Sequence, residues 1–236
     1  MKRETMTYLQ EAFAAPEPER KEAFIKKTPR VQMSMASFVK TQIGYIRKRV
    51  WVLSILLFLL ALNCTEYVGQ ESAWAIASLT PYIAVCAVTE SARSITYGMQ
   101  ELEMSTRFSL KSVTIARLFS IGFLHLLILG ALIPVAGKLS FLPMVQSGIY
   151  LVVPYLLSSL LGLMAVRRLH DREIIYVCLG SAVLVSLLYS MARVYLSWIY
   201  EEKYLILWGV MAAYLLVKVW KEYKEMIYQT EEFAWN

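Results

Sequence analysis

The sequence predicts an all-α integral membrane protein with an N-terminal interfacial helix, six transmembrane helices and both termini in the cytoplasm. Hydrophobic residues make up 58% of the 236 positions, which is high for a soluble domain and ordinary for a polytopic helical protein. They gather in six stretches, each close to the ~20 residues of helix that cross a hydrocarbon core. The stretches are Val50–Val68, Ala73–Val88, Val113–Val135, Val145–Val166, Ile174–Met191 and Tyr204–Trp220.

The placement of basic residues predicts the orientation. Eleven of the 24 Lys and Arg residues precede the first stretch, and most of the others lie in the second and fourth gaps or after the sixth stretch. Basic residues resist translocation and favour the anionic inner leaflet, so both termini are expected on the cytoplasmic side of a plasma membrane. The net charge of +6 is therefore a topology signal, and no nucleic-acid partner is expected.

Residues 1–49 are expected to form a cytoplasmic and interfacial segment. Ser34 or Ser37 can cap a helix that runs towards Arg49, in which apolar and basic positions alternate. This pattern favours a helix lying in the inner headgroup region, with its basic face on anionic lipid. The alternative is a simple cytoplasmic extension of the first span.

Residues 50–220 are expected to form one six-helix transmembrane domain, and 221–236 a cytoplasmic tail with a loose end. Pro81 and Pro154 fall inside the second and fourth spans, where proline frees backbone carbonyls and bends the helix. The three cysteines are scattered without a Cys-x-x-Cys pair, which favours a packing role over metal or disulfide chemistry.

The gap between the second and third spans, from Thr89 to about Ser112, is the longest internal connection. A short helix over Met99–Thr106 would offer Glu101 and Glu103 on its surface and bury Leu102.

From this gap into the start of the third span the chain carries Glu90, then Gly98, Glu101, Ser109 and Arg117. In this pattern it resembles the membrane subunits of ABC-type exporters of the second permease type, whose gap reads Glu…Gly-Thr-x-Glu-x-Leu…Pro-x-Ser…Lys. The chain departs from the family pattern at four positions, which are Met99 for Thr, Glu103 for an apolar residue, Arg107 for Pro and Arg117 for Lys.

The resemblance implies a coupling helix near residues 98–109 that meets a cytoplasmic ABC ATPase through Glu101, Leu102 and Glu103. It also implies a second permease chain, like or unlike, and small relatives that export peptides such as bacitracin. The chain has no Gly-rich phosphate loop, so ATP is expected on the partner and no cofactor on this chain. Movement of the ATPase would then reach the spans through this helix.

His125, Arg193 and Arg117 are ionisable residues that lie within the spans or close to their ends. His125 lies mid-span, where it either contacts substrate or, as we favour, is a neutral imidazole hydrogen-bonded to a neighbouring helix. Arg193 lies near the outer end of the fifth span, where it can extend to water, pair with Glu201 or Glu202, or contact substrate. Arg117 lies near the inner face, where it can set topology and pair with Glu90.

No residue pattern indicates catalysis or a metal site. The two histidines, His125 and His170, lie at opposite levels of the membrane, and no His-Glu-x-x-His helix or serine nucleophile motif is present. The protein is therefore not expected to be an enzyme.

The substrate class follows only loosely from composition. The chain has 15 Tyr, 11 Met and 6 Trp, which would suit a path for an amphipathic or hydrophobic peptide, lipid or drug. Aromatic residues also anchor helices at membrane interfaces, and this explanation stays open.

Two other classes of function are weighed against export. One is a non-transporting membrane regulator or anchor that binds a cytoplasmic partner through its N-terminal segment. The other is an ion-driven carrier, which the lack of acidic residues in mid-span disfavours.

Overall fold

The computed structural model describes residues 34–68, 72–93, 97, 110–140, 143–169 and 173–232. The chain divides into two units, 1–38 and 39–236, and the helix bundle belongs to the second. The described part is helical and contains no strand. Its helices are α3 (Met35–Tyr45), α4 (Lys48–Val68), α5 (Ser72–Ser91), α8 (Leu110–Ser140), α9 (Met144–Arg168), α10 (Ile174–Tyr195), η2 (Ser197–Tyr200), η3 (Glu202–Tyr204) and α11 (Leu205–Glu232).

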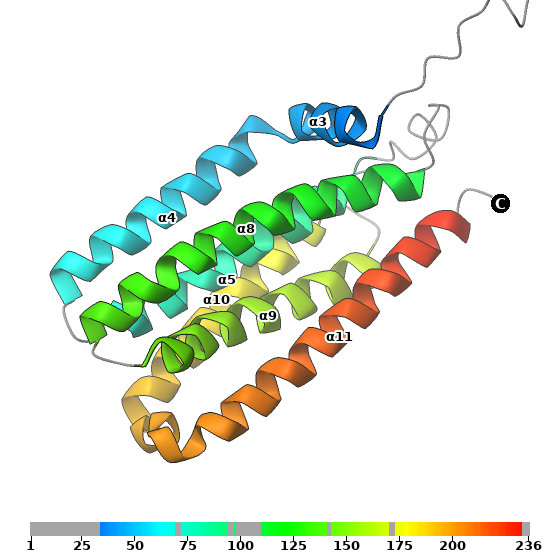
Figure 1. The fold of residues 1–236 in the computed structure, drawn as a ribbon. Helices are drawn as coiled ribbons and strands as arrows, with labels where there is room; N and C mark the ends of the chain where they lie inside the picture. Colours follow the sequence, from blue (N-terminus) through cyan, green and yellow to red (C-terminus); the bar gives the residue numbers. More distant parts are fainter. Residues whose placement is uncertain are drawn as a thin grey trace, which may run out of the picture. The chain divides into compact units, whose positions relative to one another are not determined.

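Successive long helices of the bundle run in opposite directions (Figure 1). α4, α8 and α10 run one way, and α5, α9 and α11 run back. We call one end of the bundle the basic end, because it carries Arg47, Arg93, Arg117, Arg167 and Lys221. The opposite end is the aromatic end, because it carries Trp74, Tyr150, Tyr189, Tyr200 and Trp208.

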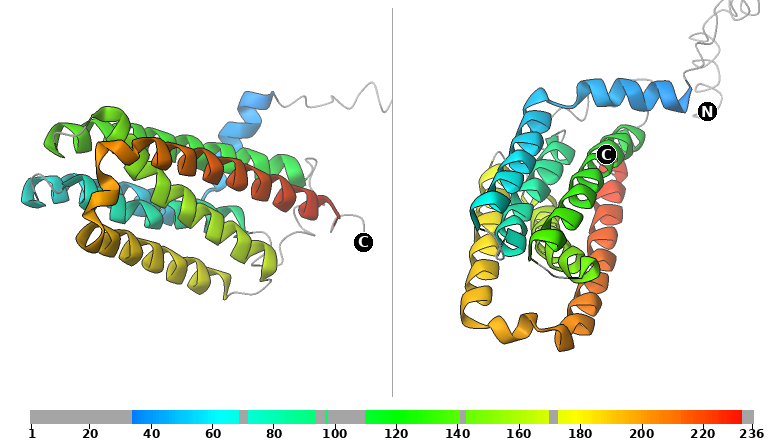
Figure 2. Two further views of the ribbon diagram at one scale, coloured as in Figure 1. Left: turned by 90° about the horizontal axis from the view of Figure 1, so that it is seen from below. Right: turned by 60° about the vertical axis from the view of Figure 1, so that its left-hand side comes forward.

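Two helices, α5 and α9, form the centre of the bundle. α5 contacts α4, α8, α9 and α10, while α9 contacts α5, α8, α10 and α11. The other helices surround this pair, and α10 and α11 stand apart on either side of α9 (Figure 2). The central position follows from composition, because α5 and α9 hold small and hydroxyl-bearing residues that allow close packing.

α5 and α9 approach each other closely along their length. A β-carbon added at Gly162 would lie 3.1 Å from Cγ1 of Val88, so any larger residue here would require Val88 to shift. Two hydroxyl groups also make hydrogen-bond contacts between the two helices. Thr80 Oγ1 lies 3.2 Å from Leu151 O and shares its one proton between that carbonyl and Ala77 O, while Ser158 Oγ donates to Pro81 O at 3.2 Å. Such bonds replace the water that a hydrocarbon core does not supply.

The prolines inside α5 and α9 leave carbonyls that hydroxyl groups satisfy. Pro81 cannot bond to Ala77 O, which instead accepts a hydrogen bond from Thr80 Oγ1 at 2.9 Å. Pro154 likewise leaves Tyr150 O, which accepts from Tyr189 Oη of α10 at 2.9 Å. Of the carbonyls that these prolines free, Ala77 O therefore accepts a hydrogen bond within its own helix and Tyr150 O accepts one from a neighbouring helix.

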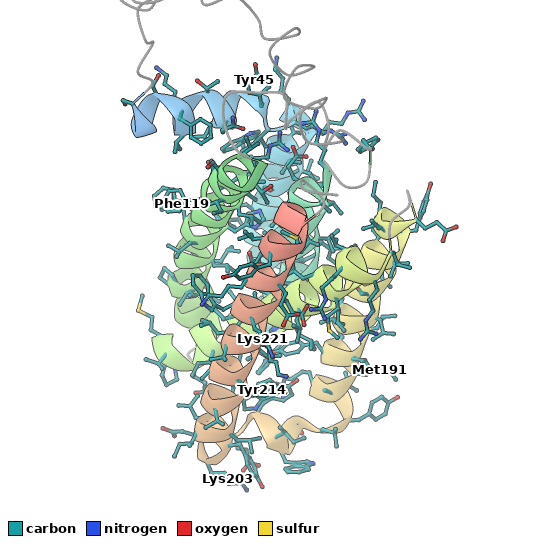
Figure 3. The ribbon with its side chains drawn as sticks, turned by 90° about the vertical axis from the view of Figure 1, so that its right-hand side faces the viewer. Tyr45, Phe119, Met191, Lys203, Tyr214 and Lys221 are labelled. Atoms are coloured by element: carbon teal, nitrogen blue, oxygen red, sulfur yellow. The ribbon has the colours of Figure 1, made fainter. Side chains whose placement is uncertain are left out.

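Five helices are long and apolar enough to cross a membrane, among the residues described. They belong to α5, α8, α9, α10 and α11. Apolar side chains point away from the bundle, as Phe119 of α8 and Met191 of α10 do (Figure 3). An exposed apolar surface of this kind is expected where lipid, rather than water, surrounds the protein.

Two helix boundaries differ from the sequence prediction. α3 begins after Ser34, whose Oγ accepts from Ser37 N at 3.3 Å, but it ends at Tyr45 instead of reaching Arg49. The chain breaks at Ile46 and Arg47 before α4 begins. The last helix, α11, continues to Glu232, well beyond Trp220. The predicted helix at 99–106 lies outside the described residues.

Candidate functional site

The basic end carries a cluster of polar side chains around Glu90. This residue sits in the last turn of α5 and is only 2% exposed. Its Oε1 lies 3.4 Å from Arg93 Nη1 and accepts a hydrogen bond from the backbone N of Arg47 at 3.4 Å. A negatively charged carboxylate is unfavourable at a helix C-terminus, because this end of the helix dipole is also negative. The donors from Arg93 and Arg47 offset that cost.

The same cluster connects the start of α4 with the chain that follows α5. The guanidinium of Arg47 lies over the ring of Tyr97, 4.7 Å from its centroid, and Nη1 donates to Tyr97 Oη at 3.5 Å. Arg93 Nη1 also donates to Tyr45 O at 3.1 Å. The cluster therefore joins the α3–α4 junction, the end of α5 and Tyr97, which precedes the predicted coupling segment.

The sequence-predicted coupling residues fall into two groups. Glu90 and Arg117 both lie at the basic end, and Arg117 is 7% exposed on α8. The remaining five, Gly98, Glu101, Leu102, Glu103 and Ser109, lie outside the described residues, so their predicted contacts stay predictions.

A second charged contact at the basic end joins α9 to α11. Arg167 Nε lies 3.3 Å from Glu222 Oε2, and Arg167 Nη1 pairs with Glu225. These side chains are only partly exposed, and α9 ends here, so the ion pairs fix the C-terminal half of α11 against the end of α9.

His125 is buried among three helices in the middle of the bundle, with 1% of its surface exposed. Nε2 lies 3.4 Å from Ser54 Oγ of α4, and Nδ1 lies 3.3 Å from Tyr155 Oη of α9. A neutral imidazole can donate from one nitrogen and accept at the other, and each hydroxyl can serve either role. The arrangement links α4, α8 and α9.

Arg193 lies at the aromatic end, over the ring of Trp74 and 4.8 Å from its centroid. The contact holds the guanidinium against an aromatic face, where part of its charge is stabilised. Glu201, one of the predicted partners of Arg193, lies 2.9 Å from Lys203 Nζ.

The aromatic end also contains five rings from five elements. Trp74, Tyr150, Tyr189, Tyr200 and Trp208 pack with centroids between 4.5 and 6.2 Å apart. Most contacts are edge-to-face, which is a favourable geometry for aromatic rings. These side chains pack on one another and connect α5, α9, α10, η2 and α11.

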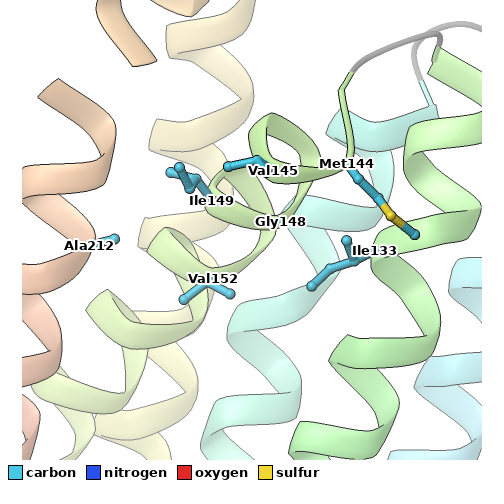
Figure 4. A pocket seen from close by; sticks show the side chains of 7 residues that line it. All are labelled: Ile133, Met144, Val145, Gly148, Ile149, Val152 and Ala212. Carbon is cyan, nitrogen blue, oxygen red and sulfur yellow. The ribbon is translucent and has the colours of Figure 1, made fainter. Parts of the chain in front are cut away.

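An apolar groove opens among α8, α9 and α11 and has a volume of about 400 Å³ (Figure 4). Its lining has no hydrogen-bonding side chain and consists of Ile133, Met144, Val145, Gly148, Ile149, Val152 and Ala212. The groove can therefore hold only a group without polar atoms.

Sequence reasoning missed Arg47 and Arg93 as partners of Glu90, and Tyr97 as a partner of Arg47. Arg93 follows Glu90 by three positions, a spacing that predicts a helical ion pair. The backbone contact from Arg47 spans 43 positions and leaves no local signal.

No cluster of metal-ligating residues occurs within the described ranges. No protein-family model matches the chain, and neither a curated protein nor a solved structure matches it.

Proposed function

We propose that this chain is the permease subunit of an ATP-driven exporter, with six transmembrane helices and both termini in the cytoplasm. α4 would supply the sixth span, because it has 21 residues. One row of its side chains is exposed and apolar, namely Val52, Leu53, Ile55, Leu56, Leu59 and Leu60. In this orientation the basic end faces the cytoplasm, as the distribution of Lys and Arg favours.

The position of Glu90 is the observation that carries this proposal. It begins the motif that resembles the exporter family, and it is buried where α4, α5 and Tyr97 meet. A push on the segment at 98–109 would reach α4 and α5 together through this cluster. That transfer is what a permease without its own ATPase needs.

The translocation path would form with a second permease chain, identical or different. α5 and α9 fill the middle of the described bundle with each other's side chains, which supports a path at its surface. The apolar groove suits the hydrocarbon part of an amphipathic peptide, lipid or drug. ATP would bind the partner ATPase, and this chain would carry no catalytic residue.

Co-purification tests the proposal directly. The chain is expressed with the products of its neighbouring genes, extracted in mild detergent and analysed for bound proteins. We expect a stoichiometric ATPase that is lost when Glu101, Leu102 and Glu103 are replaced by Ser. Replacement of Glu201 and Glu202 at the aromatic end is the matched control and should leave the complex intact. Retention of the ATPase after the first replacement would refute the coupling role.

Orientation is tested separately with fusions to the C-terminus. A green fluorescent protein fusion should fluoresce and an alkaline phosphatase fusion should be inactive, because the C-terminus is expected in the cytoplasm. The reverse pattern would contradict both the six-span topology and the cytoplasmic coupling segment.

The division of the chain after Phe38 favours a second candidate function. A unit separate from the bundle suits a membrane anchor or regulator that binds a cytoplasmic partner through its N-terminal segment. In the same co-purification, deletion of residues 2–33 would then remove the partner, whereas replacement of residues 101–103 would not.

A further inference from the structure

Most residues in the connection between α10 and α11 are exposed, and one is buried. This connection, which we call the strap, covers residues 196–204 and includes η2 and η3. Its side chains are mostly exposed, as for Leu196, Trp198 and Lys203, and Lys203 lies at the extreme of the bundle (Figure 3). Tyr200 alone is buried, with 6% of its surface exposed.

Tyr200 contacts a ring from each of four helices. Its centroid lies 4.5 Å from that of Trp74 in α5 and 5.5 Å from that of Tyr150 in α9. It lies 5.9 Å from that of Tyr189 in α10 and 5.0 Å from that of Trp208 in α11. One side chain therefore holds the strap on the aromatic end.

Backbone carbonyls of the strap are bound to the same helices. Tyr200 O accepts hydrogen bonds from Tyr150 Oη at 3.0 Å and from Gln146 Nε2 at 3.4 Å. Ile199 O accepts from Trp208 Nε1 at 3.0 Å. The docked position thus fixes the first turn of α11 against α9.

The hydroxyl of Tyr200 opposes this docking. Tyr200 Oη is buried and makes no hydrogen bond to any residue that the structure describes. A buried phenol without a partner loses the hydrogen bonds that water would give it. Ring contacts and backbone bonds favour the docked strap, whereas hydration of the hydroxyl favours its release.

We propose that Tyr200 is a latch and that the strap exchanges between a docked state, in which α10 and α11 are joined across α9, and a released state. α10 packs on α5 and α9, while α11 packs on α9 and α8, so release would leave the outer part of α11 free to move relative to α10. The latch is a property of this chain and does not rest on the proposed export function.

Hydrogen–deuterium exchange of the full chain in lipid nanodiscs tests the latch. Three strap amides, those of Ile199, Glu201 and Tyr204, bond to carbonyls within the strap and report on its opening. In the wild type they should exchange together and faster than amides in the middle of α9. Tyr200→Phe removes the unpaired hydroxyl, so docking no longer carries the cost of burying it. Exchange of the three amides should then slow by about tenfold.

The sign of this effect separates a latch from an ordinary packing residue. Tyr200→Ala should speed exchange of the strap while leaving the middle of α9 protected. Tyr204→Phe is the matched control in the same strap and should change nothing. Unchanged or faster exchange in Tyr200→Phe, or wild-type strap amides as slow as those of α9, would overturn the proposal.

Discussion

The aromatic end joins its helices through rings and neutral hydroxyls, whereas the basic end joins them through charged groups. At the aromatic end, Tyr150 and Trp208 connect α9 with α11. At the basic end, Arg167 connects the same two helices through Glu222 and Glu225. Ionic contacts weaken with salt and ring contacts do not, so the two ends of α11 should respond differently to solution conditions.

The central contact between α5 and α9 should matter more than either end. Gly162→Leu places a side chain against Val88, where even a β-carbon would lie 3.1 Å away. We expect a loss of about 1–3 kcal/mol, as for other overpacked interiors, measured by thermal unfolding in detergent. Gly180→Leu is the control, because no atom lies within 4 Å of a β-carbon at Gly180. Equal effects of the two substitutions would show that the helices do not depend on close approach.

Loss of one hydroxyl should weaken the aromatic end by a smaller amount. Tyr189→Phe leaves the carbonyl of Tyr150, freed by Pro154, without its hydrogen bond of 2.9 Å. We expect a cost of about 1 kcal/mol, typical of interhelical hydrogen bonds in membranes. Tyr195→Phe, at an exposed tyrosine of the same helix, should have no measurable effect on unfolding. A similar loss in both variants would contradict the assigned role of the carbonyl.

Removal of the charge at the basic end should have an effect that depends on salt. Arg167→Gln breaks the ion pairs with Glu222 and Glu225, whose side chains are partly exposed to solvent. The cost should be below about 1 kcal/mol at low ionic strength because solvent screens the charges. It should shrink further as salt is added, while the cost of Tyr189→Phe should stay constant. A salt-independent loss in Arg167→Gln would remove the contrast between the two ends.

Alkaline pH should produce the smallest of these changes in stability, and we expect it in the docking of the strap. Burial raises the pKa of Tyr200 to about 12, and nearby Tyr150 also raises it while Arg193 lowers it. Tyr189 is the other titratable group that faces Tyr200. A released Tyr200 would ionise near its ordinary pKa of 10, so docking is at full strength below pH 10 and weakens as pH rises towards 12. Exchange of the strap amides, corrected for intrinsic rates, should rise in this window and should not rise in Tyr200→Phe.

The length and apolar content of the hydrophobic stretches predict much of the helical fold. Every one of the six long helices in the described residues covers a stretch that the sequence marks as apolar, because span length and apolar content are local properties. The end of α3 at Tyr45 was not predicted, since the bond from Arg47 N to Glu90 that accompanies the break comes from a distant helix.

Less of the candidate site than of the fold can be predicted from the sequence. The position of Glu90 at the basic end follows from its place after the second span, and Arg93 follows from helical spacing. The aromatic end could not be derived, because composition does not tell whether Trp74 and Tyr200 face lipid, a path or each other. Periodicity identifies faces of a helix, but the partner of each face depends on contacts that are distant in the chain.

The hydrogen bonds between α5 and α9 have a consequence for biogenesis. α5 carries Thr80 and Pro81, whose interhelical bonds are made to α9, 71 and 77 positions later in the chain. When α5 leaves the ribosome, α9 has not yet been synthesised, so these interhelical bonds cannot form and the Thr80 hydroxyl has only its local bond to Ala77 O. α5 should therefore remain near the translocon or its chaperones until α9 arrives. A chain truncated after α8 should be recognised by membrane quality control, although helices α4, α5 and α8 would already be complete.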